Sequence, residues 1–324
     1  GLIGEYVKKH YPQEIEIRYF KRPELFIEAI RVENPDIAGL SYYIWNNNLN
    51  NLVFDIVKRH NPNILTIGGG PNITNLNCHQ KGLQRFFAMA RNCDVYVLNQ
   101  GENGFLQIIN EYIKLNKNTS RIKQKNIPGC FVNTSIPGND ILIGSPLVYI
   151  NELDEIPSPY LSGAFDEFFE YPYIPIIETN RSCPYRCTYC AWGIGTKQLT
   201  YYSTDRVKAE IEYIAERCKN AGFIWVCDAN FSILKRDEEI AEKFYECYVK
   251  YRFPVHVMVQ WNKSRPQRIV DIAKKFRGLA DVVQSFQSIH EPTLKAIKRK
   301  NLPIETVKEM IKEFRSNGIH VISE

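Results

Sequence analysis

Short apolar strands alternate with amphipathic helices along most of this chain, and that alternation is what most restricts its fold. In the first part, apolar segments bounded by turn residues predict strands at 15–20, 37–42, 64–67 and 95–98. Helical periodicity predicts helices at 23–32, 50–59, 81–91 and 104–115. Strands alternating with helices form a mostly parallel sheet covered on both faces. We therefore expect a doubly wound α/β domain over residues 1–115.

The second part repeats the same alternation with helices of similar length. Strands are predicted at 174–178, 223–227, 255–260, 282–287 and 319–323, and helices at 205–220, 237–251, 266–276, 291–298 and 303–317. This gives five strand–helix units over residues 173–324. Between the two parts, residues 116–172 are rich in Lys, Asn and Pro-Gly pairs, which predicts a linker with a hairpin. Because the chain opens without Met and stops directly after a strand, we expect a piece of a longer protein.

Three cysteines follow the first strand of the second part in the spacing C-x3-C-x2-C: Cys183, Cys187 and Cys190. Iron–sulfur clusters of the ferredoxin type and structural zinc sites both take four protein ligands. Three thiolates on one loop leave a coordination position open, which is typical of a reacting site. A zinc site completed by a remote donor is the alternative. The remote donors would be His256, His290 or Cys218, none of which has a paired ligand spacing.

The cysteine loop, with its aromatic Tyr189, resembles the cluster loop of the radical S-adenosylmethionine (SAM) superfamily. The resemblance implies a four-iron four-sulfur cluster on the three cysteines and reductive cleavage of SAM at it. It also implies an incomplete (β/α)6 partial barrel, truncated after the fifth strand, with its chemistry at the carboxyl ends of the strands. Polar residues at those ends are the candidate SAM contacts: Tyr189, Asp228, Asn230, Gln260, Ser285, Gln287 and Glu324.

Glycines and polar residues also follow the predicted strands of the first part. Gly-rich turns let a backbone approach a large ligand closely. These loops resemble the cobalamin-binding domain that precedes the barrel in one branch of the superfamily, although Gly104 stands where the branch has Glu. The resemblance implies these cobalamin contacts: Ser41, Tyr42, Trp45, Gly68, Gly69, Gly70, Gly101 and Glu102. A dinucleotide site is less well supported, since Gly68-Gly-Gly70-Pro71 comes late and contains proline.

Together the two resemblances imply a cobalamin-dependent radical SAM enzyme that transfers a methyl group to an unactivated carbon. Its partners would be a small-molecule or peptide substrate and an electron donor such as flavodoxin or ferredoxin. One alternative is a methylthiotransferase-like or other radical SAM enzyme without bound cobalamin. The methylthiotransferase would need a second cluster, for which Cys78, Cys93 and Cys130 are the available cysteines. The other alternative is a non-catalytic cobalamin or cluster sensor.

The composition restricts the cellular location and the classes of partner that we expect. Nine cysteines, an odd number, occur without a secretory signal or an apolar run of membrane-spanning length. This combination predicts a reducing cytoplasm and metal chemistry rather than disulfides. The net charge of +5 is spread along the chain, and the basic stretch 295–300 is interpreted as a solvated helix face. We therefore expect neither a nucleic-acid partner nor a membrane.

Overall fold

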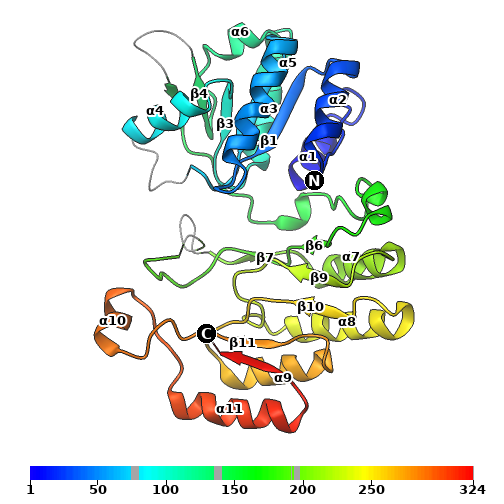
Figure 1. The fold of residues 1–324 in the computed structure, drawn as a ribbon, viewed down its shortest axis with the longest axis vertical. Helices are drawn as coiled ribbons and strands as arrows, with labels where there is room; N and C mark the ends of the chain where they lie inside the picture. The colour runs from blue at the N-terminus through cyan, green and yellow to red at the C-terminus, as the bar shows by residue number, and fades with distance from the viewer. Residues whose placement is uncertain (74–79, 135–140, 191, 193–197, 324) are drawn as a thin grey trace. The chain divides into compact units, whose positions relative to one another are not determined.

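The computed structural model describes residues 1–73, 80–134, 141–190, 192 and 198–323. The chain divides into two compact units, Gly1–Ile150 and Asn151–Glu324. Each unit has its own sheet and its own helices (Figure 1). Among the described residues, no helix is both long enough and apolar enough to span a membrane.

The first unit is built on a five-stranded sheet in the order β1-β2-β3-β4-β5. Its strands are β1 (Ile37–Ser41), β2 (Leu65–Gly69), β3 (Val95–Val97), β4 (Cys130–Asn133) and β5 (Ile141–Ile143). The first three are parallel, and β4 and β5 add an antiparallel hairpin beside β3. The helices are α1 (Leu2–His10), α2 (Pro23–Glu33), α3 (Asn47–His60), α4 (Gln80–Met89), α5 (Glu102–Lys114) and α6 (Thr119–Ile122).

Helices cover both faces of this sheet, as predicted. On one face, Phe54 of α3 and Phe86 of α4 pack on Tyr96 of β3. On the other face, Ile108 of α5 packs with Ile67 of β2. Alternate residues of a strand point to opposite faces, so strands buried on both sides are apolar along their whole length. The burial of every residue of β3 agrees with that rule.

Two expectations for this unit need correction. Residues 15–20 form no strand, although their burial alternates in places as a strand's would. Alternation predicts an extended backbone, but a strand also needs a neighbour to complete its hydrogen-bonded ladder. The predicted hairpin exists, yet it joins the sheet of the first unit, so that unit continues past residue 115 to Ile150, and the units divide inside the predicted linker 116–172.

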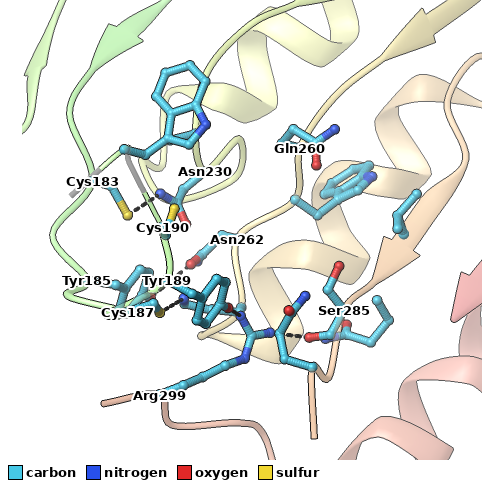
Figure 2. A pocket seen from close by; sticks show the side chains of 17 residues that line it. Cys183, Tyr185, Cys187, Tyr189, Cys190, Asn230, Gln260, Asn262, Ser285 and Arg299 are labelled. Atoms are coloured by element: carbon cyan, nitrogen blue, oxygen red, sulfur yellow. Dashed lines mark hydrogen bonds between the residues drawn. The ribbon is translucent and has the colours of Figure 1, made fainter. Parts of the chain in front are cut away.

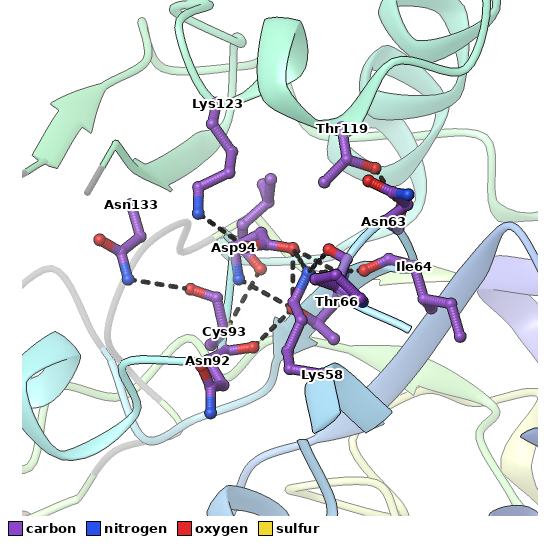
Figure 3. A network of polar contacts seen from close by, with 12 residues as sticks. Lys58, Asn63, Ile64, Thr66, Asn92, Cys93, Asp94, Thr119, Lys123 and Asn133 are labelled. Atoms are coloured by element: carbon purple, nitrogen blue, oxygen red, sulfur yellow. Dashed lines mark hydrogen bonds and ion pairs between the residues drawn. The ribbon is translucent and has the colours of Figure 1, made fainter. Parts of the chain in front are cut away.

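A buried ion cluster links β2 and β3 near their amino ends (Figure 3). Asp94 is only 1% exposed and forms ion pairs with Lys58 and with Lys123, the latter at 3.2 Å. The backbone N–H of Thr66 donates to Asp94 Oδ2 at 3.1 Å, and the Thr66 hydroxyl donates to the same oxygen at 2.9 Å. This cluster fixes the register of two strands whose opposite ends carry the candidate cofactor loops.

The second unit has two groups of parallel strands. A three-stranded sheet has the order β10-β9-β6, and β11 pairs with β12. Their bounds are β6 (Ile176–Ile177), β9 (Phe223–Val226), β10 (His256–Met258), β11 (Val282–Gln284) and β12 (Val321–Ser323). Val257 N–H of β10 donates at 2.7 Å to the carbonyl of Leu279, in the segment that leads into β11. A small antiparallel pair, β7 (Asn180–Arg181) and β8 (Thr200–Tyr201), brackets the cysteine loop.

The helices of this unit are η1 (Leu153–Glu155), η2 (Asp166–Glu170), α7 (Thr204–Arg217), α8 (Asp237–Tyr251), α9 (Pro266–Phe276), α10 (Glu291–Ala296) and α11 (Ile304–Ser316). Four of them form a row in the order α7, α8, α9 and α11, each in contact with the next (Figure 1). The predictions for α8 and α9 are confirmed at both ends. Helix α9 begins with a proline at its first position and buries an apolar stripe that includes Ile269 and Phe276. A proline at the first position is a standard signal for the start of a helix. An apolar stripe is typical of a helix that packs on the core.

Candidate active site at the cysteine loop

A cavity of about 220 Å³ lies in the second unit at the carboxyl ends of its parallel strands. The loops that follow β6, β9, β10 and β11 all contribute to its wall, together with the segment after α10 (Figure 2). Its lining is Cys183, Tyr185, Cys187, Tyr189, Cys190, Trp192, Ala229, Asn230, Gln260, Trp261, Asn262, Lys263, Val283, Gln284, Ser285, Gln287 and Arg299. Parallel strands bring their carboxyl ends to one edge, which explains why residues so distant in sequence meet here.

All three cysteines of the C-x3-C-x2-C motif line this cavity. Cys183 and Cys187 are each 7% exposed, and Cys190 is half-buried. Two of the sulfurs accept hydrogen bonds: Asn230 Nδ2 donates to Cys183 Sγ, and Lys263 Nζ donates to Cys187 Sγ, both at 3.0 Å. Soft thiolates are the preferred ligands of iron–sulfur clusters, and anionic sulfur is stabilised by N–H donors. The donor set therefore fits a cluster bound by three cysteines.

The Cys187 thiol lies in a positively charged environment. Burial raises its pKa, but the hydrogen bond and charge of Lys263, with contributions from Tyr189 and Arg299, outweigh burial and bring the pKa below its ordinary value. Since the thiolate is the form that binds metal, these neighbours favour the ligating state.

The cavity collects five of the seven predicted SAM contacts: Tyr189, Asn230, Gln260, Ser285 and Gln287. Glu324 lies outside the described residues. The Tyr189 side chain is half exposed and borders the open space with one ring edge held by Arg299, whose Nη1 donates to the Tyr189 hydroxyl at 2.9 Å. An aromatic ring fixed at its hydroxyl can present a flat face to a planar ligand group.

The prediction that Asp228 contacts SAM needs correction, because this side chain does not line the cavity. It is 1% exposed, and Oδ1 accepts from the backbone N–H groups of Thr179 at 2.7 Å and Asn180 at 3.2 Å. Its Oδ2 accepts from Asn180 Nδ2 at 2.7 Å and from the Thr179 hydroxyl. The carboxylate thus secures the strand end that leads into the cysteine loop. Burial raises its pKa to about 7, although the hydrogen bonds from Thr179 and from the Asn180 backbone N–H act in the opposite direction.

Sequence reasoning missed Arg299 and Lys263. The basic stretch 295–300 was interpreted as a solvated face, but Arg299 is only 9% exposed. Its Nε donates to Asn301 Oδ1 at 2.8 Å, and its Nη2 donates to the Ser285 carbonyl. Lys263 follows Trp261 and Asn262 directly, so its position after a predicted strand was the available signal. Charge runs are usually solvated, which is why the pattern alone gave the wrong assignment for Arg299.

In the first unit, several predicted cobalamin contacts serve internal packing. The Tyr42 side chain is fully buried among core aromatics, and its hydroxyl donates to Asn51 Oδ1 at 3.0 Å. A Cβ on Gly68 would lie 2.9 Å from Cys93 Sγ, and one on Gly70 would lie 2.6 Å from the Tyr42 carbonyl oxygen. Internal packing therefore accounts for the absence of a side chain at Gly68 and Gly70, and this absence is no separate evidence for a ligand. Tyr42, Gly68 and Gly70 stay predictions as cobalamin contacts.

The remaining predicted contacts lie at the carboxyl edge of the same sheet: Ser41, Trp45, Gly69, Gly101 and Glu102. Trp45 is 78% exposed and stacks on Tyr43 with ring centroids 4.5 Å apart. A Cβ on Gly69 would meet no atom closer than 3.6 Å, so internal packing does not require that glycine. Gly101, with φ +84°, caps the start of α5, and Glu102 is buried in its first turn. An exposed aromatic surface and an unconstrained glycine at the same edge of the sheet are compatible with a large planar ligand.

The residues required by the alternative metal sites lie elsewhere. The remote zinc donors His256, His290 and Cys218 are absent from the lining of the cavity described above. Within the described ranges, no three His, Cys, Asp or Glu side chains are placed to hold a single metal ion. Cys93 and Cys130 are fully buried in the hydrophobic cores on opposite faces of the first sheet, and Cys78 lies outside the described residues. The structure therefore gives Cys93 and Cys130 no shared site.

Comparison with known proteins agrees with this geometry. Residues 177–324 match the model of the radical SAM superfamily. The 2-(S-pantetheinyl)-carbapenam-3-carboxylate methyltransferase of Streptantibioticus cattleyicolor is 30% identical over 339 aligned residues, which cover all of this chain and 47% of that protein. The cobalamin-dependent radical SAM methyltransferase TokK of Streptomyces tokunonensis is 28% identical, again over all of this chain and 47% of its own length. This chain thus spans about half the length of these relatives.

Solved structures share the fold. The radical SAM methyltransferase TsrM from Kitasatospora setae, solved with tryptophan and a SAM analogue, superposes with a TM-score of 0.68 at 12% identity, covering 99% of this chain and 64% of that one. The cobalamin-dependent SAM radical enzyme OxsB, solved with aqua-cobalamin and SAM, gives a TM-score of 0.67 at 16% identity. That match covers 100% of this chain and 46% of OxsB.

Proposed function

Because the chain belongs to the radical SAM superfamily, we propose that it cleaves SAM reductively at a four-iron four-sulfur cluster held by Cys183, Cys187 and Cys190. We propose further that cobalamin bound to the first unit assists methyl transfer to an unactivated carbon of a small-molecule or peptide substrate. The observation that carries the proposal is the convergence of the loop with the three cysteines and the loops after β9, β10 and β11 around one cavity. The similarity along the whole chain to two methyltransferases, one of them named as cobalamin-dependent, supports the second part.

Three cysteine ligands fit a cluster that supplies one electron and one iron with an open coordination position. The role of the chain is then to hold a sulfonium ligand beside that position and to exclude water. Tyr189 offers a ring face at one side of the cavity, and Ser285 and Gln287 offer polar groups at the β11 side. Trp192 and Trp261 supply apolar wall, which protects a reactive carbon species from solvent.

Arg299 connects the cysteine-loop side of the cavity with the side formed after β11. Its guanidinium donates to the Tyr189 hydroxyl on the cysteine loop and to the Ser285 carbonyl after β11. The Thr188 N–H also donates to the Ile297 carbonyl at 3.0 Å, so the cysteine loop is attached to the segment after α10 at two points. Preorganised walls of this kind reduce the entropy lost when a flexible ligand is bound.

For cobalamin, the residues that fit are those at the carboxyl edge of β1–β3 whose exposure is not explained by packing. Trp45 and Gly69 are the strongest candidates, and Ser41, which pairs with Gly69, is also exposed. Cobalamin would supply methyl-transfer chemistry when bound. The exposed Trp45–Tyr43 stack and the close approach allowed at Gly69 would serve to hold it.

The proposal is tested on protein reconstituted anaerobically with iron, sulfide and hydroxocobalamin. Cobalamin retained after desalting and 5′-deoxyadenosine released from SAM under reductant are measured separately. We expect stoichiometric cobalamin, and deoxyadenosine that disappears in Cys187→Ala. SAM cleavage without retained cobalamin would support the cobalamin-free radical SAM alternative. A full cluster without SAM cleavage would refute the catalytic proposal and leave a sensor.

A substrate search follows if both signals are present. Candidate small molecules and peptides are incubated with SAM that carries an isotopically labelled methyl group, and the products are analysed by mass spectrometry. Mass gain equal to one labelled methyl group supports methyl transfer. A product without the label, formed together with deoxyadenosine, would contradict methyl transfer while retaining the radical reaction.

A further inference from the structure

The segment directly after β10 contacts the cysteine loop at several points. The Tyr185 hydroxyl, from the loop between the first two cysteines, donates to Asn262 Oδ1 at 2.9 Å and lies 2.5 Å from Ser264 Oγ. Asn262 Nδ2 in turn donates to the Ser264 carbonyl at 2.8 Å. The tyrosine is therefore fixed by a short turn whose middle residue is Lys263.

Lys263 makes two contacts with the same loop. Its ammonium lies 4.4 Å from the centroid of the Tyr185 ring, a cation–π contact, and Nζ donates to Cys187 Sγ at 3.0 Å. The side chain is half-buried, so water screens these contacts less than it would on an open surface. A positive charge is thus held at hydrogen-bond distance from one sulfur of the loop.

We propose that Lys263 is a positioning residue that orients Cys187 and raises the reduction potential of the metal group bound there. The inference rests on the proposed function, because it needs a cluster on the three cysteines. Asn230 is the neutral counterpart, since it donates to Cys183 Sγ at the same distance of 3.0 Å. The two donors differ in charge, and the charged one contributes more to the potential.

The physical reason is the charge added on reduction. One electron enters from an external one-electron reductant, such as dithionite or a flavodoxin, and no bond forms or breaks. The added negative charge is shared by the coordinating sulfurs, so an ammonium in contact with Cys187 stabilises the reduced state more than the oxidised state. Net charge and hydrogen bonds to sulfur are established determinants of cluster potential.

Binding of the SAM carboxylate is the competing role for the same ammonium, since both Lys263 and the open space border one cavity. The geometry favours the role at sulfur, because the ammonium already lies between the Tyr185 ring and Cys187 Sγ. The two roles predict different measurements. A residue that acts on the sulfur changes the potential without SAM present, whereas a carboxylate ligand changes only the affinity for SAM.

The test is a dye-mediated reductive titration of the reconstituted protein without SAM, followed by absorption and by electron paramagnetic resonance. Lys263→Met removes the charge and the donor at similar length, and Lys263→Arg keeps the charge. The matched control is Lys295→Met, which removes an exposed lysine from α10. SAM affinity of each protein is measured in parallel by equilibrium dialysis.

In Lys263→Met we expect the equilibrium constant for reduction to fall about tenfold, which is about 59 mV for one electron. The reduction potential of Lys263→Arg should lie closer to the wild-type potential than that of Lys263→Met does, and the potential of Lys295→Met should equal the wild-type potential. If Lys263→Met binds no cluster, Lys263→Gln, which keeps a neutral donor, should lower the potential in the same direction.

An unchanged potential in the loaded Lys263→Met or Lys263→Gln protein overturns the inference and leaves the proposed function intact. An unchanged potential with weakened SAM binding assigns Lys263 to the carboxylate instead and equally overturns it. A wild-type protein that assembles no cluster overturns the proposed function, and the inference is lost with it.

Discussion

Replacing Asp94 by Asn should lower the free energy of unfolding of the first unit by about 3 kcal/mol. Removing one partner of a buried ion pair costs about 3–5 kcal/mol, because the other charge stays buried without compensation. Asp94 pairs with Lys58 and Lys123, whose side chains are 13% and 22% exposed. This partial access to water, and the oxygen that Asn keeps for the Thr66 donors, place the cost at the lower end of that range (Figure 3).

The chain offers a matched control in the pair between Asp36 and Lys117. Their charged atoms are 2.7 Å apart, but both side chains are more than half exposed, at 55% and 60%. Surface pairs of this kind contribute less than about 1 kcal/mol. Asp36→Asn removes the same chemical group from the same unit, so the difference between the two variants isolates the effect of burial.

Urea unfolding followed by far-ultraviolet circular dichroism gives the free energies. Hydrogen–deuterium exchange of peptides that cover β2 and β3 then locates the change, since Asp94 and Thr66 connect those strands. We expect faster exchange there in Asp94→Asn and wild-type exchange in Asp36→Asn. Equal stability of the two variants would refute the argument that burial makes this ion cluster important.

Two further outcomes concern the cysteine loop. Arg299→Met removes the donor to the Tyr189 hydroxyl and should weaken SAM binding to the reconstituted protein about tenfold, the equivalent of one charge-assisted hydrogen bond; unchanged affinity in equilibrium dialysis would contradict this. Burial raises the pKa of Asp228 to about 7 from an ordinary value of 3.8, so its folded carboxyl binds a proton more tightly than the unfolded one. Stability from this group is therefore present at low pH and is lost as the pH rises from about 4 to about 7. Asp228→Asn should therefore reduce the dependence of the melting temperature on pH between about pH 4 and pH 7. A pH dependence like that of wild type would contradict this assignment.

Most helices could be predicted from the sequence because their signals are local. Helix α9 combines a proline at its start with a regular apolar stripe, and α8 begins with three acidic residues and buries a comparable stripe. Such patterns depend only on residues within a few turns of one another. The strands were found for the same reason. Most are shorter in the structure than their apolar segments, since only residues with a hydrogen-bonded neighbour form a ladder, whereas β2 continues past its predicted end to Gly69.

The failures share a different cause. Residues 15–20 have a strand-like pattern but no partner strand among the described residues, and the hairpin of β4 and β5 joined a sheet that the punctuation of 116–172 did not indicate. In both cases the outcome depends on pairing between segments distant in sequence. Pattern reasoning gives the tendency to extend, whereas the choice of neighbour is made by the assembled sheet.

The C-x3-C-x2-C spacing by itself predicts which residues would bind metal and that one coordination position would stay open, because the three cysteines belong to one loop. It could not determine what surrounds those sulfurs. The burial of Asp228 against Thr179 and Asn180, and the contact of Lys263 with Cys187, join residues between 48 and 76 positions apart. Only the tertiary structure decided them, because a polar side chain at a strand end can serve the backbone or the cavity equally well until its neighbours are in place.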